Sequence, residues 1–173
     1  YNWLYFNNFS SSGTGKLQKY ENEELFNLEI SCICKTINLN KVPDPYLYHE
    51  LASMYLDYYN FSKNVTHIQK AYAAIEKCIS IEKRRWQHWN LLGVICVYKA
   101  INKQSLAQHA FIKALKLDPI NSTLWSNLGV FYLIIGEQKL ANQSFKKAQE
   151  GNPAFIQSWI GQALIAECVG HHE

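Results

Sequence analysis

The sequence contains no uninterrupted apolar run of eighteen residues, the length that a helix needs to cross a membrane. The chain also lacks a strong excess of charge of one sign. Its formal net charge is +3, which is too small to indicate a nucleic-acid-binding surface. The chain shows no signal peptide and starts at Tyr1 rather than at methionine. With 48% apolar and 14% aromatic residues, it is predicted to be ordered.

Cysteine is present but lacks the patterns of disulfide or zinc frameworks. The chain has an odd number of cysteines, which favours a reducing compartment and thiols that pack as small apolar groups. Two of them form a C-x-C, which points to opposite sides of a helix, and no second pair follows at zinc spacing, so we expect no metal site. The five cysteines are Cys32, Cys34, Cys78, Cys96 and Cys168.

Signatures of catalysis are missing as well. The histidines are dispersed, and none has a recurring carboxylate partner; no G-x-S-x-G is present. The GTGK at residues 13–16 lacks the upstream glycine and the Ser/Thr of a phosphate loop. We therefore expect no enzyme activity, no cofactor and no small-molecule substrate. The histidines are His49, His67, His88, His109, His171 and His172.

Residues 122–153 carry the most informative pattern. Large and small residues recur three, four and seven apart, which places them on one face of a helix, and a second such set follows. Together they match the tetratricopeptide pattern W-x2-L-G-x2-Y…A-x3-F…P. The matching residues are Trp125, Leu128, Gly129, Tyr132, Ala141, Phe145, Ala148 and Pro153.

The pattern has a packing reason. Gly129 has no side chain, so a second helix can cross close to its backbone, and Phe145 is large enough to fill the gap beside Ala141. Gly136 is expected to end the first helix, and Pro153 cannot continue the second. A single helix pair cannot bury its apolar face, so neighbouring pairs should exist.

The pattern recurs upstream. A copy that lies 34 to 36 residues earlier contains Trp89, Leu92, Gly93, Ala107, Phe111, Ala114 and Pro119. The change of offset indicates a two-residue insertion between its helices, near residues 99–103. A fainter copy comprises Tyr48, Leu51, Ala52, Tyr55, Ala71, Ile75 and Cys78. About seven surplus residues around 59–67 mean that this copy has either longer helices or a longer loop.

These copies predict an all-α solenoid of tetratricopeptide helix pairs, as an internal fragment of a longer array. A helix over about 22–39 and the Ser/Gly loop before it complete a degenerate preceding repeat, and Trp159 opens a further first helix over about 155–169. We expect the repeats to have the following boundaries. Residues 1–43 form the degenerate preceding repeat and its loop, 44–85 a divergent repeat, 86–121 and 122–155 two regular repeats, and 156–173 the first helix of a truncated repeat.

Three strings in the second half carry a more specific resemblance. LAQHAFIKAL (106–115), LWSNLGVFYL (124–133) and WIGQALIAECVG (159–170) resemble the tetratricopeptide scaffold subunits of superkiller complexes over about residues 86–170. The resemblance implies a solenoid that holds a DExH RNA helicase and WD-repeat subunits and supports 3′–5′ mRNA decay by the cytoplasmic exosome. It implies a cytoplasmic location, with a nuclear pool left open, and at most indirect RNA contact.

The first helices supply a candidate partner-binding groove. It comprises Asn90, Val94, Ser126, Asn127 and Val130. No lysine or arginine occupies these or the equivalent positions, which argues against a chaperone-docking module that clamps an acidic C-terminus with paired cations. A generic scaffold of some other assembly remains an alternative, because fold alone does not fix function.

One basic run, Lys83, Arg84 and Arg85, has two interpretations. It is either a solvated turn at a helix C-terminus, where cations suit the helix dipole, or a contact for RNA or an acidic partner.

Overall fold

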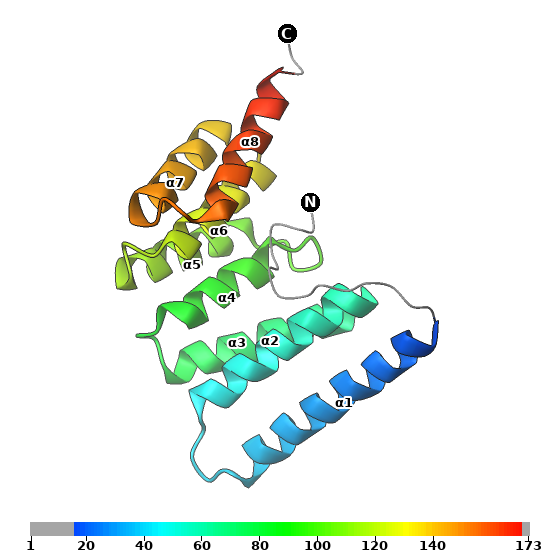
Figure 1. The fold of residues 1–173 in the computed structure, drawn as a ribbon. Helices are drawn as coiled ribbons and strands as arrows, with labels where there is room; N and C mark the ends of the chain where they lie inside the picture. The colour runs from blue at the N-terminus through cyan, green and yellow to red at the C-terminus, as the bar shows by residue number, and fades with distance from the viewer. Residues whose placement is uncertain (1–15, 171–173) are drawn as a thin grey trace.

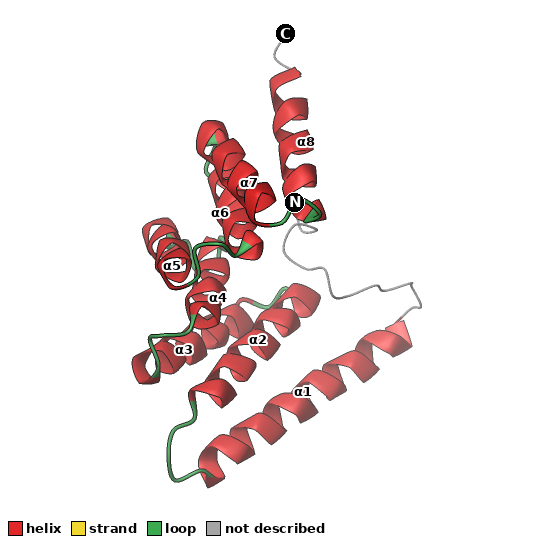
Figure 2. Ribbon diagram, turned by 60° about the vertical axis from the view of Figure 1, so that its left-hand side comes forward, coloured by secondary structure: helices red, strands yellow, loops and turns green. Residues whose placement is uncertain are grey.

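The computed structural model describes residues 16–170, with the side chains of residues 23–167. Those residues form helices and loops without a strand, which confirms the all-α prediction (Figure 2). The helices are α1 (Lys16–Leu39), α2 (Pro45–Ser62), α3 (Val65–Ile81), α4 (Trp86–Val97), α5 (Gln104–Leu117), α6 (Ser122–Ile134), α7 (Gln138–Gly151) and α8 (Ile156–Gly170). The predicted Ser/Gly loop, the first three residues of GTGK, the side chain of Cys168, and His171 and His172 lie outside the described part.

The helices pack in pairs that stack one above another, from α1 to α8 (Figure 1). The most extensive contacts join α2 to α3, α4 to α5 and α6 to α7, the three expected pairs. Successive pairs meet through α3 with α4 and through α5 with α6, while α1 covers α2 and α8 covers α7. The first helices of the pairs, α2, α4, α6 and α8, also contact one another in sequence, so they form a continuous surface.

Each of the two clearest pairs closes on a phenylalanine ring that rests against a glycine. A Cβ atom added at Gly129 would lie 2.7 Å from Cε1 of Phe145, and one added at Gly93 would lie 2.6 Å from Cε1 of Phe111. Both rings are at most 1% exposed. The small residues beside them on the second helices are fully buried: Ala107, Ala110, Ala114, Ala141 and Ala148. The core therefore depends on a large ring that fills the space that a glycine leaves.

The repeated tryptophans hold the turns between the pairs. The indole N–H of Trp125 donates to the carbonyl of Pro119 at 2.8 Å, and that of Trp159 donates to the carbonyl of Pro153 at 2.9 Å. Trp89 makes the same bond to the residue six positions earlier, Lys83, at 2.9 Å. Each tryptophan thus donates a hydrogen bond to a backbone carbonyl in the turn before its helix, a carbonyl that accepts no helical hydrogen bond.

The surplus residues of the divergent repeat lengthen its helices rather than its loop. α2 and α3 have 18 and 17 residues, against 12 to 14 in the next two pairs, and only Lys63 and Asn64 separate them. The extra turn is covered by neighbours, since Tyr58 stacks on Phe26 of α1 with 5.0 Å between ring centroids. Longer helices are favoured because α1 gives the added turn apolar surface to bury.

The insertion between α4 and α5 is anchored on the preceding repeat. Its Lys103 Nζ donates to the Tyr72 hydroxyl at 2.9 Å and lies 4.1 Å from the centroid of that ring. Tyr98 donates to Asn60 Oδ1 at 2.8 Å, so both ends of the inserted loop contact the α2–α3 pair.

The expected start of the first helix needs correction. α1 begins at Lys16, six residues before the predicted start, and it buries a stripe that contains Phe26, Ile30 and Ile33. Leu25 and Leu28 lie outside that stripe and are exposed, because α1 packs mainly against α2 with one face.

On α8, the side chain of Trp159 is 55% exposed. The helix buries Ser158 and Gly161 instead, and the ring of Phe145 lies directly against Gly161. A single ring of α7 therefore contacts glycines on both flanking first helices, α6 and α8.

Replacing Gly129 by alanine should lower the free energy of unfolding by about 1–3 kcal/mol, because the new methyl group would displace the Phe145 ring. Helix propensity alone predicts the opposite sign, a gain of about 0.5–1 kcal/mol for Gly→Ala. Chemical denaturation followed by circular dichroism decides between the two.

The matched control is Thr123→Ala, an exposed position on the same helix, for which we expect little change. In a Phe145→Leu background, Gly129→Ala should lower the free energy of unfolding by less, because the smaller leucine side chain leaves room for the new methyl group. A Gly129→Ala protein as stable as the parent would show that the crossing of α6 and α7 is looser than described.

Candidate partner-binding groove

The first helices of the pairs line one groove with a volume of about 410 Å³. α2, α4 and α6 contribute most of its wall, and the start of α8 closes one end. The lining residues are His49, Ser53, Leu56, Trp86, Gln87, Asn90, Leu91, Val94, Thr123, Ser126, Asn127, Phe155 and Gln157.

Four of the five groove residues that the sequence suggested line this groove. Asn90 and Asn127 are half-buried, and their amides join α4 to α6 through a hydrogen bond from Asn127 Nδ2 to Asn90 Oδ1 at 2.9 Å. Val94 and Ser126 are more deeply buried and form the floor. The fifth, Val130, is 3% exposed and does not line the groove, so it belongs to the core.

The groove is neutral and mixed in character. Among the described residues that line it, none is Lys, Arg, Asp or Glu. Amide and hydroxyl groups stand beside aromatic and aliphatic side chains. Such a surface can hydrogen-bond a polypeptide backbone and cover apolar side chains, but it offers no cation to an anionic ligand.

The basic run lies apart from the groove, in the exposed turn between α3 and α4. Arg85 is paired with Glu82, with 3.3 Å between Nε and Oε2, and the carbonyl of Lys83 accepts the Trp89 indole N–H. These contacts give the run a role in the turn. Lys83 and Arg84 side chains face solvent, so the alternative of an RNA or acidic-protein contact stays a prediction.

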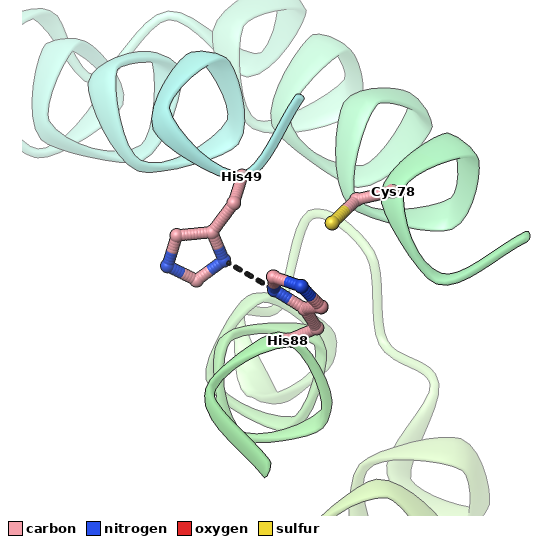
Figure 3. A group of neighbouring side chains, drawn as sticks. All are labelled: His49, Cys78 and His88. Atoms are coloured by element: carbon pink, nitrogen blue, oxygen red, sulfur yellow. Dashed lines mark hydrogen bonds between the residues drawn. The ribbon is translucent and has the colours of Figure 1, made fainter. Parts of the chain in front are cut away.

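One end of the groove contains a cluster that sequence reasoning missed. We expected dispersed histidines without a carboxylate partner, yet His49 of α2 and His88 of α4 lie side by side, with 3.1 Å between their Nδ1 atoms. The Nε2 atom of His88 lies 3.6 Å from Oε2 of Glu82. Cys78 of α3 points toward the two rings (Figure 3).

Burial sets the protonation of this cluster. Desolvation, and secondarily the neighbouring His88, lower the pKa of His49 to about 4. Burial also lowers the pKa of His88, although Glu82 opposes the shift. Both imidazoles are therefore neutral at neutral pH. Burial, together with the charges of Glu82 and Asp44, raises the pKa of the Cys78 thiol to about 12.

The signal that could have found this pair is the repeat register. His49 follows Tyr48 by one residue, and His88 precedes Trp89 by one, so both lie on first helices that the repeat stacks together. Cys78 fills the slot of Ala114 and Ala148 in the second helices. Spacing along the chain hides the cluster, because 39 residues separate the two histidines.

Comparison with known proteins supports the repeat assignment. The chain is 44% identical over 106 residues to Tetratricopeptide repeat protein 37 of Xenopus laevis, and 36% identical over 106 residues to Superkiller complex protein 3 of Mus musculus. Each match covers 61% of this chain and 7% of the relative, so the chain spans a small part of their length. No family model matches the sequence.

Solved structures share the fold. The crystal structure of MamA superposes with a TM-score of 0.69 at 18% identity, and the match covers 92% of this chain and 87% of that one. YrrB, described as a TPR protein with an unusual peptide-binding site, gives 0.68 at 13% identity, covering 83% and 69%. The first TPR of Spaghetti (RPAP3), bound to the HSP90 peptide SRMEEVD, gives 0.62 at 11% identity, covering 73% and 93%. The chain thus has the tetratricopeptide fold.

Within residues 16–170, no helix combines the length and the apolar character that a membrane span requires.

The neutral groove predicts that the protein does not bind the acidic peptide SRMEEVD, because no lysine or arginine of the groove can pair with its carboxylates. Fluorescence anisotropy with the labelled peptide should show no saturation up to about 1 mM, which corresponds to less than roughly 4 kcal/mol of binding free energy. The RPAP3 domain, which was solved with this peptide, is the positive control. Saturable binding in the micromolar range would contradict the groove's assignment as a neutral surface.

Proposed function

We propose that this chain is a segment of a tetratricopeptide scaffold in a superkiller-type complex, where it holds partner proteins and performs no chemistry. The observation that carries the proposal is the identity of 31–44% over 106 residues to relatives from frog, mouse and human, two of which are named Superkiller complex protein 3. The fold alone would support only a protein-interaction role.

The partners proposed are a DExH RNA helicase and WD-repeat subunits, in an assembly that supports 3′–5′ mRNA decay by the cytoplasmic exosome. The protein is then cytoplasmic, and RNA passes through the helicase rather than over this segment. The groove supports a protein ligand, since its neutral lining suits a peptide segment better than a phosphate backbone.

A second candidate is a generic tetratricopeptide scaffold of another assembly. It is favoured by the groove itself, which lines the same first helices that a peptide-binding array would use and carries nothing particular to one complex. The chaperone carboxylate clamp is the least supported, because the lining residues that the structure describes include no Lys or Arg.

Purification of the full-length protein that contains this segment, from a cell extract under low salt, tests the proposal. We expect co-purification of a DExH helicase and a WD-repeat protein in stoichiometric amounts, identified by mass spectrometry. Recovery of an unrelated set of partners, with neither of these two, would contradict the superkiller assignment and leave the generic scaffold.

Substitutions of groove residues then test whether this segment contributes to partner binding. Asn90→Ala with Asn127→Ala should reduce recovery of one partner several-fold, because both amides are reachable and their loss removes paired hydrogen-bonding groups. Lys146→Ala on the outer face of α7 is the control and should leave recovery unchanged. Equal recovery for the double variant and the control would place the partner elsewhere on the scaffold.

A further inference from the structure

Three side chains with metal-binding atoms converge from three helices beside the groove. One ligand atom each from His49 of α2, Cys78 of α3 and His88 of α4 lies within 4.8 Å of the other two (Figure 3). His88 is 3% exposed and Cys78 is fully buried. The Nε2 atom of His88 is buried without a hydrogen bond. Its nearest charged neighbour is Oε2 of Glu82 at 3.6 Å, beyond hydrogen-bond distance, so the contact as it stands does not satisfy this nitrogen.

We propose that His49, Cys78 and His88 bind a zinc ion, and that Glu82 is a positioning residue that orients the His88 ring. The two histidines bind through their Nδ1 atoms and Cys78 through its thiolate sulfur, which leaves a fourth position for water. Imidazole nitrogen and thiolate sulfur are both zinc ligands, and three protein ligands with a water in the fourth position complete a tetrahedral site.

The geometry needs little adjustment. In a tetrahedral zinc site, Zn–N distances near 2.05 Å and a Zn–S distance near 2.3 Å separate the ligand atoms by about 3.3–3.6 Å. The two Nδ1 atoms are 3.1 Å apart, and one ligand atom from each of the three side chains lies within 4.8 Å of the other two. A shift of about an ångström, available to the side-chain torsion of Cys78, brings the three ligands to binding distance.

The surroundings of His88 match those of a metal-bound histidine. Such a histidine commonly donates its second ring N–H to a carboxylate, which fixes the tautomer and the ring plane. With Nδ1 facing His49, the Nε2 atom of His88 faces Oε2 of Glu82 at 3.6 Å. Glu82 is the C-cap residue of α3, and Arg85 holds its carboxylate from the other side. A small closure on metal binding converts this contact into the missing hydrogen bond.

Protonation favours the imidazole ligands and opposes the thiol. The lowered pKa values keep both rings neutral, as zinc requires. The high pKa of Cys78 reflects its burial and the nearby negative charges of Glu82 and Asp44. A bound zinc ion would add a positive charge that favours the thiolate. On binding, the S–H bond breaks, its proton goes to solvent, the sulfur lone pair forms the Zn–S bond, and the hydrogen bond from Cys78 Sγ to the Pro45 carbonyl is given up. The imidazole whose Nδ1 donates in the His49–His88 hydrogen bond loses that proton and takes one up at Nε2, so that both rings stay neutral and both Nδ1 lone pairs are free for zinc.

Zinc has a path to the site. His49 is only half-buried and lines the groove, so an ion can reach it from solvent. The site is separate from the C-x-C of α1, where Cys32 is exposed and Cys34 half-buried. Substitution of Cys32 and Cys34 therefore serves as the control for metal binding by thiols outside the cluster.

Cobalt titration of the reduced, metal-free protein tests the proposal. Co²⁺ should bind with a stoichiometry of one, and give the visible bands of a tetrahedral site together with a sulfur-to-cobalt charge-transfer band in the near ultraviolet. Zinc should displace it and raise the melting temperature. A Cys32→Ser, Cys34→Ser double variant should bind in the same way, because its thiols are outside the cluster.

Variants assign the ligands. Cys78→Ser should abolish the charge-transfer band, whereas Cys96→Ser, equally buried on α4, should retain it. His49→Gln should weaken cobalt and zinc affinity at least tenfold, with helical content unchanged by circular dichroism. Glu82→Gln should weaken affinity about 10- to 100-fold while the band positions persist, as expected of a positioning residue. Glu150→Gln, an exposed carboxylate on α7, is its control.

Two kinds of result would contradict the proposed zinc site. Absence of tetrahedral cobalt bands would show that the cluster is a hydrogen-bonded pair of histidines beside a buried thiol and nothing more. Binding that survives His49→Gln and Cys78→Ser, or that disappears in the Cys32→Ser, Cys34→Ser variant, would place the metal at the C-x-C and overturn the proposal.

Discussion

The contact between the Phe145 ring and two glycines is the constraint on which the array depends. The ring is fully buried between Gly129 of α6 and Gly161 of α8, so one side chain of a second helix sets the approach of the first helix on either side. Protein cores are packed densely enough that such a fit fixes the spacing of the helices rather than merely filling a space. Phe111 against Gly93 repeats the contact within a pair, one pair earlier. The tryptophan-to-turn hydrogen bonds then fix the angle at which each pair follows the last.

This close packing has a functional consequence on the first helices. Because α2, α4, α6 and α8 follow one another along the stack, their outward side chains form one groove instead of separate patches. The amide pair Asn90–Asn127 bridges α4 and α6, and the His49–His88 pair bridges α2 and α4. These two polar contacts between successive first helices lie on the groove side, whereas apolar contacts hold the interior. A rigid surface of this kind binds with little cost of ordering, which is the physical advantage of a solenoid scaffold.

Much of the fold could be predicted from the sequence, because the repeat pattern encodes contacts within a pair. Trp125, Gly129 and Phe145 indicated the helix pair and its crossing, since their spacing fits helices and little else. The pattern could not say whether the surplus residues of the divergent repeat lengthened helices or a loop, because that depends on whether α1 supplies a surface for Tyr58. The buried face of α1 could not be chosen for a similar reason, because Leu25 and Leu28 have helical spacing yet are exposed. The cluster of His49, Cys78 and His88 is a product of stacking, and it becomes visible only when three helices are placed together.

Hydrogen exchange of the assembled complex, compared with the free scaffold, tests most directly whether this groove is the partner-binding surface of a superkiller-type assembly. We predict slower amide exchange in α4 and in the first turns of α6, where Asn90 and Asn127 face the groove, while exchange in the outer helices α5 and α7 is unchanged. Exchange that is unaltered in α4 and α6, or slowed only in α5 and α7, would contradict it.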